Sequence, residues 1–275
     1  MEAFNFKRFT NLLMWSAQVY KKSYLTLLAS LFFGFFVINI VPVLATISDG
    51  TPWNVSTLMN IAGTCTMVLF IYWTIAGSWF LAHMQNKQQR LMYMLLPATK
   101  MEKFLARYLY ITVVWVIGGI VALALADVAR ILISGIVGIT FLSCDGTDLC
   151  PSIFPHVFRE LSSGVGINGT EDLSATLLAI AVALYGHSIY LLGGVFFSRR
   201  QFVMTAAVQL LASMLIGTVI NIFVMTTDFS FNIDNPERLF YGITAVIAVF
   251  VAINYWLSYR LFCRIQVINN KWINI

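Results

Sequence analysis

The stretch "YLTLLASLFFGFFVINIVPVLAT", residues 24–46, decides the class of fold, because it carries no charged side chain along its whole length. A helix needs about 20 apolar residues to cross roughly 30 Å of hydrocarbon. Further runs of this kind lie at 58–84, 108–126, 175–197, 202–226 and 239–262. Of the 275 residues 59% are hydrophobic and 11% charged, which exceeds the apolar surface that one soluble core hides. The sequence therefore predicts an all-α, polytopic membrane protein with six transmembrane helices.

The basic residues predict the orientation of the chain, since cytoplasmic loops collect Lys and Arg. With the N-terminus inside, most of the 17 basic residues lie in residues 1–23, 84–107, 198–201 and 263–275, all cytoplasmic. Both termini are therefore expected in the cytoplasm, flanking a transmembrane domain over 24–262, with residues 131–174 outside. The net charge of +5 then reflects membrane topology and gives no indication of a nucleic-acid partner.

The first residues are too polar for a span and predict a helix that lies along the membrane surface. Phe6, Phe9, Leu13 and Tyr20 recur at near-helical spacing beside basic and amide side chains. This pattern is typical of an amphipathic helix with its aromatic rings among the lipid headgroups. Residues 1–23 are thus predicted to form a cytoplasmic interfacial helix.

The third apolar run, 108–142, is too long for one span, because it would extend about 50 Å as a helix. Asp127 and Arg130 stand three residues apart, so they can meet on one helix face. We expect them to anchor the outer end of this span, with "ILISGIVGITFL" emerging beyond it. A short amphipathic helix is predicted around Phe154 and Val157.

Two of the four cysteines, Cys144 and Cys150, fall in the predicted outer segment, where a disulfide can persist. Two free thiols are the alternative. Cys65 and Cys263 lie in or beside spans and are interpreted as apolar fillers. The isolated histidines predict no metal site.

Catalytic motifs are absent from the sequence, which has no phosphate-binding loop, no HExxH and no GxSxG. His187 and Ser188 are neighbours on one predicted helix and point about 100° apart, so we assign no catalytic residue and interpret His187 as a helix-packing residue. Asn60, Asn221 and Asn254 lie within spans and need polar partners there. We expect them along a translocation path.

Residues 84–107 form a basic segment between the second and third spans. Thr99 and Glu102 have the spacing of a capping box, and Lys103 and Arg107 are expected to snorkel toward the headgroups. A loop that only sets topology needs no apolar side chains, yet this one holds Leu91, Met92, Met94, Leu95 and Leu96. The segment therefore predicts a docking surface for another protein.

"LMYMLLPATKMEKFLARYL", residues 91–109, is similar to the first cytoplasmic loop of permease subunits of ABC-type exporters, the type-two permease family. The likeness lies in a leucine, a proline, a small residue and then a Glu-Lys pair before a helix. It implies a helix that docks on a separate cytoplasmic ATPase. The residues that would couple to that ATPase are Leu91, Met92, Leu95, Leu96, Pro97, Thr99, Glu102 and Lys103.

The resemblance also implies partners and a location. ATP and Mg²⁺ would bind the ATPase, no cofactor would bind this chain, and a second permease subunit, identical or different, would complete a pump in the inner membrane of a bacterium. The sequence departs from the family in its short 227–238 segment, where members often carry re-entrant helices. Two alternatives stay open: a membrane-embedded enzyme built around His187, and a scaffold or sensor that acts through 143–174.

Overall fold

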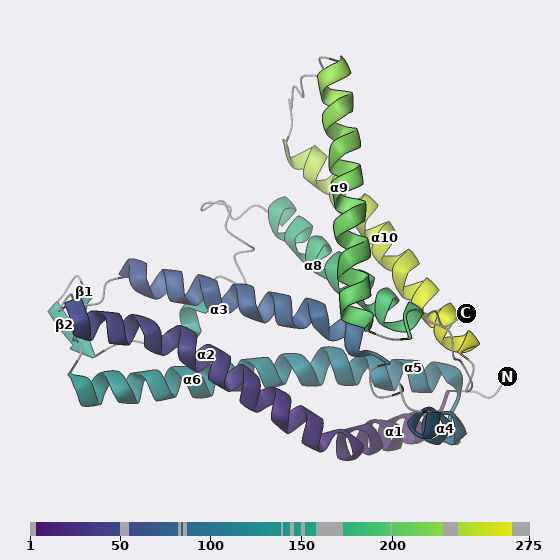
Figure 1. Cartoon of the computed structure of the whole chain (residues 1–275), viewed down its shortest axis with the longest axis horizontal. Coiled ribbons are helices and arrows are strands. Elements are labelled where there is room, and N and C mark those ends of the chain that lie inside the picture. The colour runs from purple at the N-terminus through teal and green to yellow at the C-terminus, as the bar shows by residue number, and fades with distance from the viewer. Residues whose placement is uncertain are drawn as a thin grey trace. The chain divides into compact units, whose positions relative to one another are not determined.

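The computed structural model describes residues 4–49, 55–81, 84, 87–138, 140–143, 146–149, 152–157, 173–198, 200–227 and 236–265. Its main elements are long helices (Figure 1). In chain order they are α1 (Phe6–Val19), α2 (Lys21–Asp49), α3 (Val55–Ala76), the 3₁₀ turn η1 (Gly77–Trp79), α4 (Lys87–Leu95), α5 (Lys100–Leu109), the π-helical η3 (Tyr110–Val114), α6 (Trp115–Val137), α8 (Leu173–Phe196), α9 (Gln201–Thr227) and α10 (Pro236–Arg264).

In the part of the chain that the structure describes, six helical segments are long and apolar enough to cross a membrane, which confirms the predicted fold class and number of spans. They are Lys21–Ala45, Ser56–Trp79, Lys100–Val137, Thr176–Phe196, Gln201–Val219 and Phe240–Arg264. The protein is thus a multi-pass α-helical membrane protein. The cytoplasmic placement of its termini stays a prediction.

The third span differs most from the sequence expectation. α5, η3 and α6 run as one helical path from Lys100 to Val137, so the chain stays helical for two turns beyond Arg130. The helix ends where Gly138 adopts a left-handed conformation, with φ 74°, which glycine tolerates without strain. Beyond it β1 (Thr140–Ser143) and β2 (Gly146–Leu149) form an antiparallel hairpin in which Thr140 faces Leu149. The sequence analysis missed this hairpin because its strands are short.

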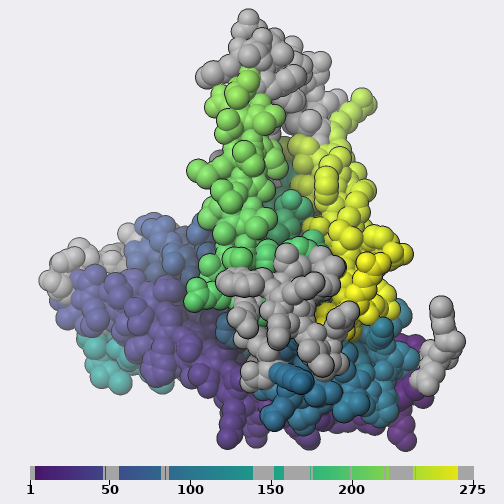
Figure 2. Space-filling view, turned by 45° about the vertical axis from the view of Figure 1, so that its right-hand side comes forward, coloured from purple at the N-terminus to yellow at the C-terminus, as the bar shows by residue number. Residues whose placement is uncertain are grey.

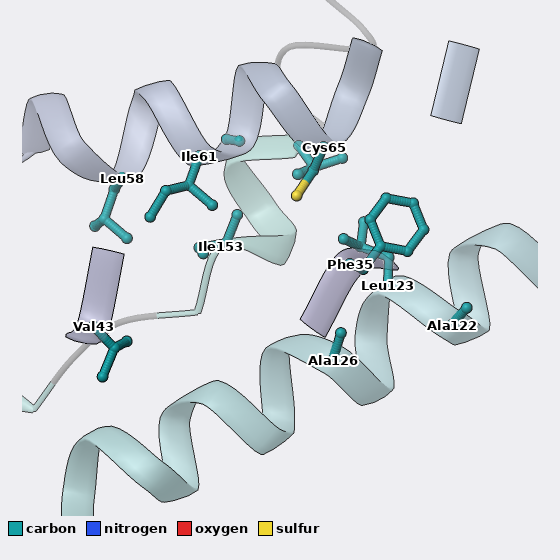
Figure 3. Close-up of a cluster of buried hydrophobic side chains, with 11 residues drawn as sticks. Phe35, Val43, Leu58, Ile61, Cys65, Ala122, Leu123, Ala126 and Ile153 are labelled. Atoms are coloured by element: carbon teal, nitrogen blue, oxygen red, sulfur yellow. The ribbon is translucent and has the colours of Figure 1, made fainter. Parts of the chain in front are cut away.

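The chain divides into two compact units, one of residues 13–73 and 112–171 and the other of 1–12, 74–111 and 172–275. In the first unit α2, α3 and α6 surround an apolar core that includes Phe35, Cys65 and Leu123 (Figure 3). Ile153, from the segment that follows the β-hairpin, enters the same core. Beside it the Tyr24 hydroxyl donates to the Val114 carbonyl oxygen over 2.8 Å.

In the second unit α8 lies against η1 and α10. The contact with η1 brings backbone against backbone: a Cβ atom on Gly77 would lie 2.8 Å from the His187 carbonyl oxygen, and one on Gly194 would lie 2.8 Å from the Gly77 carbonyl oxygen. Close approach of this kind requires glycine on both sides. α9 meets α8 near its first turns, where the ring of Phe202 stacks on that of Tyr190.

The N-terminal helix exists as predicted, but its aromatic residues are divided between its faces. Phe9, Leu12 and Tyr20 are buried, whereas Phe6 and Met14 are exposed. The exposed face therefore carries apolar side chains next to Lys7, as an interfacial helix requires.

Candidate functional site

The segment after the second span, α4, forms a hairpin with α5, the first part of the third span. Its second helix begins at the predicted capping box, which the structure confirms. The Thr99 hydroxyl accepts a hydrogen bond from the Glu102 backbone N–H over 3.2 Å, and Glu102 Oε2 accepts one from the Thr99 N–H over 2.8 Å. These two bonds satisfy donors that a helix start would otherwise leave unpaired.

Glu102 also binds the N-terminal segment, which sequence reasoning missed. Its Oε1 accepts hydrogen bonds from the Asn5 backbone N–H over 2.7 Å and from Arg8 Nη2 over 3.3 Å. The Glu102 side chain is fully buried. Because a buried carboxylate makes strong charge-assisted bonds, Glu102 fixes the start of α1 against the start of α5.

Lys103 and Arg107 are buried as well, so the prediction that they snorkel toward the headgroups is wrong. Lys103 Nζ donates to the Met94 carbonyl oxygen over 2.7 Å, in the last turn of α4, where the helix dipole favours a cation. Arg107 Nε donates to the Phe80 carbonyl oxygen over 3.0 Å. The two basic side chains therefore connect α5 to the segments before it.

Two further bonds tie α4 to α5 and to the residue Met84 that precedes α4. The Tyr93 hydroxyl donates to the Lys103 carbonyl oxygen over 2.6 Å, and Arg90 Nε donates to the Met84 carbonyl oxygen over 3.1 Å. Burial lowers the pKa of Arg90 from its ordinary value. The buried polar groups Arg90, Glu102, Lys103 and Arg107 thus hold α4 and α5 in one fixed arrangement.

Four apolar side chains at the start of the hairpin point outward. Leu91, Met92, Leu95 and Pro97 are exposed, with Met92 at 61% and Leu95 at 76%. We call these four residues the docking face. Of the other residues singled out from the sequence, Leu96 and Thr99 are half-buried, and Glu102 and Lys103 lie beneath the surface as its support.

α5 is joined to α10 by three contacts that recur every four residues, and together we call them the α5–α10 ladder. Lys100 Nζ donates to the Cys263 carbonyl oxygen over 2.9 Å. The ring of Phe104 meets that of Tyr259 edge to face, with centroids 5.4 Å apart. The Tyr108 hydroxyl donates to that of Tyr255 over 3.3 Å. Contacts spaced this way lie along one face of each of the two antiparallel helices.

The ladder continues from α10 to α8. His187 is fully buried, and its Nδ1 lies 3.1 Å from the Tyr255 hydroxyl. Asn254 Nδ2 donates to Ser188 Oγ over 3.0 Å, which joins the same two helices. Ser188 Oγ itself donates to the Tyr185 carbonyl oxygen of its own helix. His187 and Asn254 thus act in helix packing.

The three asparagines assigned to a translocation path lie on three different helices. Asn254 is half-buried on α10 and donates a hydrogen bond to Ser188. Asn60 on α3 and Asn221 on α9 are exposed. Asn221 lines a shallow groove with Ser213, Gly217 and Thr218 of its own helix. A shared path for the three remains a prediction.

Asp127 and Arg130 form the predicted ion pair, with Arg130 Nη2 and Asp127 Oδ1 2.7 Å apart and both side chains buried. Asp127 Oδ2 accepts hydrogen bonds from Ser152 Oγ over 2.6 Å and from the Ile153 backbone N–H over 3.0 Å. The pair therefore anchors the helical turn at 154–157 to α6. The sequence predicted the pair through its spacing but not its second partner.

Cys144 and Cys150 lie outside the described residues, so their disulfide stays a prediction. Cys65 is buried and Cys263 half-buried, both as free thiols. Among the residues that the structure describes, no group of three His, Cys, Asp or Glu side chains could hold a metal ion. The sequence matches no family model, no curated protein and no solved structure.

Proposed function

We propose that this chain is the membrane-spanning permease subunit of an ATP-driven ABC exporter. ATP and Mg²⁺ would bind a separate cytoplasmic ATPase, and a second permease subunit would complete the pump in a bacterial inner membrane. The resemblance of residues 91–109 to the coupling loop of such permeases supports this proposal. The chain's own part would be to receive the motion of the ATPase and to guide a cargo across the bilayer.

The observation that carries the proposal is an exposed apolar face that lies over buried polar side chains of the same hairpin. Leu91, Met92, Leu95 and Pro97 form an exposed apolar face, while Glu102 and Lys103 are buried beneath it. A loop that only set topology would need no exposed apolar side chains. Exposed apolar side chains on a rigid base are typical of a protein-binding surface.

The α5–α10 ladder supports a mechanism for this face. A force on α4 and α5 reaches α10 through Lys100, Phe104 and Tyr108, and it reaches α8 through the Tyr255–His187 contact. When ATP closes a pair of ATPase subunits, the hairpin would follow them and the joined helices would tilt. Stiff connections make such a motion a rigid-body rotation.

The test is recovery of the native complex from its own membranes through a tagged chain. A nucleotide-binding subunit with a phosphate-binding loop is expected to co-purify. Replacing Met92 and Leu95 together by Ala removes two exposed anchors, each worth about 1.5–3 kcal/mol when buried in an interface. ATPase recovery should fall at least about tenfold, the change expected from roughly 1.4 kcal/mol.

The matched control replaces Met14 and Val19 by Ala, because these α1 side chains are also exposed and apolar. ATPase recovery with this variant should equal that of the unaltered chain. An intact native complex without any nucleotide-binding subunit would refute the proposal. Equal recovery with the Met92 and Leu95 variant would refute the assignment of the docking face.

A further inference from the structure

The last helix, α10, is packed on one side and exposed on the other. On the packed side Ser258 and Phe262 are buried, and the ring of Phe262 meets those of Phe80 and Phe104. The opposite side is exposed, and in Figure 2 the yellow side chains of α10 stand at the surface along much of the helix. This side therefore faces whatever surrounds the protein.

The exposed side changes in chemistry along the helix, from aliphatic through aromatic to basic. Its residues recur at intervals of three or four positions, so they lie along one face, which we call the α10 face. They are Val246, Val249, Ile253, Trp256, Arg260 and Arg264. None of them is Gly, Ala or Ser, the small residues that let membrane helices approach one another closely. The α10 face therefore lacks the usual features of a contact between helices.

Trp256 and Arg260 form a stacked pair near the basic end of this face. The Arg260 guanidinium lies 4.5 Å from the centre of the Trp256 ring. A guanidinium held on an aromatic ring can still bind a phosphate group through its N–H donors. Trp is typical of the boundary between hydrocarbon and lipid headgroups. Because Arg260 and Arg264 follow Trp256, about 6 Å apart along the helix, they lie at the depth of the headgroups.

The two arginines have no carboxylate partner among the residues that the structure describes. The sequence also contains no Asp or Glu after Glu237. The C-terminal end of a helix would repel an anion, but here Lys100 Nζ donates to the Cys263 carbonyl oxygen over 2.9 Å. Three cations thus gather at one end of α10, and together they attract an anion.

We propose that the α10 face binds an anionic phospholipid. The phosphate group lies against Arg260 and Arg264, and the acyl chains follow Val249 and Ile253. A lipid supplies both the charge and the hydrocarbon that the two ends of the face require, whereas a free phosphate ion supplies only the charge. The predicted orientation places this end of α10 at the cytoplasmic leaflet, whose anionic lipids give it a negative potential. This inference goes beyond the proposed function, because it needs no ATPase.

The test titrates the purified full chain in neutral detergent with phosphatidylglycerol and counts the bound lipids by native mass spectrometry. Replacing Arg260 and Arg264 together by Gln removes both charges. The affinity of the tightest-bound lipid should fall about 25-fold, since each basic residue near an anionic headgroup contributes roughly a fivefold gain. The matched control replaces the exposed Lys21 and Lys22 of α2 by Gln, which removes the same charge and should leave this affinity unchanged. Equal losses in the two variants would overturn the site.

Two further comparisons identify the ligand. Phosphatidylcholine, which has no net charge, should bind more weakly than phosphatidylglycerol, and inorganic phosphate should not displace the bound lipid. A photo-reactive residue at position 253, in a bilayer with equal parts of the two lipids, should cross-link mainly phosphatidylglycerol. At the exposed position 215 of α9 it should cross-link both lipids equally. Displacement by inorganic phosphate, equal affinity for the two lipids, or a cross-link from position 253 to a protein would overturn the inference.

Discussion

Glu102 offers the sharpest test of how the hairpin is held together. Replacing it by Ala removes the acceptor of the Asn5 and Thr99 backbone N–H groups and the partner of Arg8. Each bond from a backbone N–H group to this buried carboxylate contributes about 1.5–3 kcal/mol. The ion pair adds about 0–1 kcal/mol because Arg8 is partly exposed, at 33%. The expected loss is therefore about 3–7 kcal/mol.

This loss acts locally, so hydrogen exchange of the backbone amides is the suitable assay. About 4 kcal/mol corresponds to a roughly 1,000-fold larger open population at 1.4 kcal/mol per factor of ten. The amides of residues 5–12 and 99–103 should therefore exchange far faster in Glu102→Ala. Glu102→Gln keeps one acceptor oxygen and should show an intermediate increase.

The control for Glu102 is its exposed neighbour, because Met101→Ala changes a side chain of similar length without removing a hydrogen bond. Exchange in both segments should stay within about twofold of the unaltered chain, as surface substitutions usually cost less than 0.5 kcal/mol. If Glu102→Ala left exchange near Asn5 unchanged, the carboxylate would not connect the N-terminal segment to α5.

Three further outcomes are expected. Asp127→Asn leaves the buried Arg130 guanidinium without its counter-charge, which should lower the stability of the anchored segment by about 3–5 kcal/mol. The segment at 152–157 should therefore become protease-sensitive, and unchanged digestion would contradict its anchoring by Asp127. Gly194→Ala should lower the melting temperature through overpacking of about 1–3 kcal/mol, whereas Gly34→Ala, with open space around it, should not lower it. Phe104→Ala removes the aromatic contact of the α5–α10 ladder and should lower the free energy of thermal unfolding by about 3–5 kcal/mol. The control Phe250→Ala changes an exposed ring and should lower it hardly at all, so equal effects of the two substitutions would contradict the ladder.

The support of the docking face could not be predicted from the sequence. From the sequence, Lys103 and Arg107 were predicted to extend toward the lipid headgroups, because their neighbours along the chain are apolar. The structure gives them carbonyl partners at Met94 and Phe80 instead. A basic side chain near a span has two ways to satisfy its charge, the headgroups or a helix C-terminus, and only the fold decides between them.

Features that depend on neighbours along the chain were determined by the sequence alone. Six spans follow from the length of hydrocarbon that a helix must cross and from its need to bond its own backbone. The Thr99–Glu102 capping box and the Asp127–Arg130 pair follow from a spacing of three residues, which brings side chains together in any helix.

The tertiary structure alone decided which distant residues meet. Asn5 and Glu102 are separated by 97 positions, and Lys100 and Cys263 by 163. The contact of Gly77 with Gly194 and the rungs of the α5–α10 ladder likewise join different helices. Apolar helices of similar composition offer many alternative pairings, and shape and hydrogen-bond complementarity across the helices select one of them.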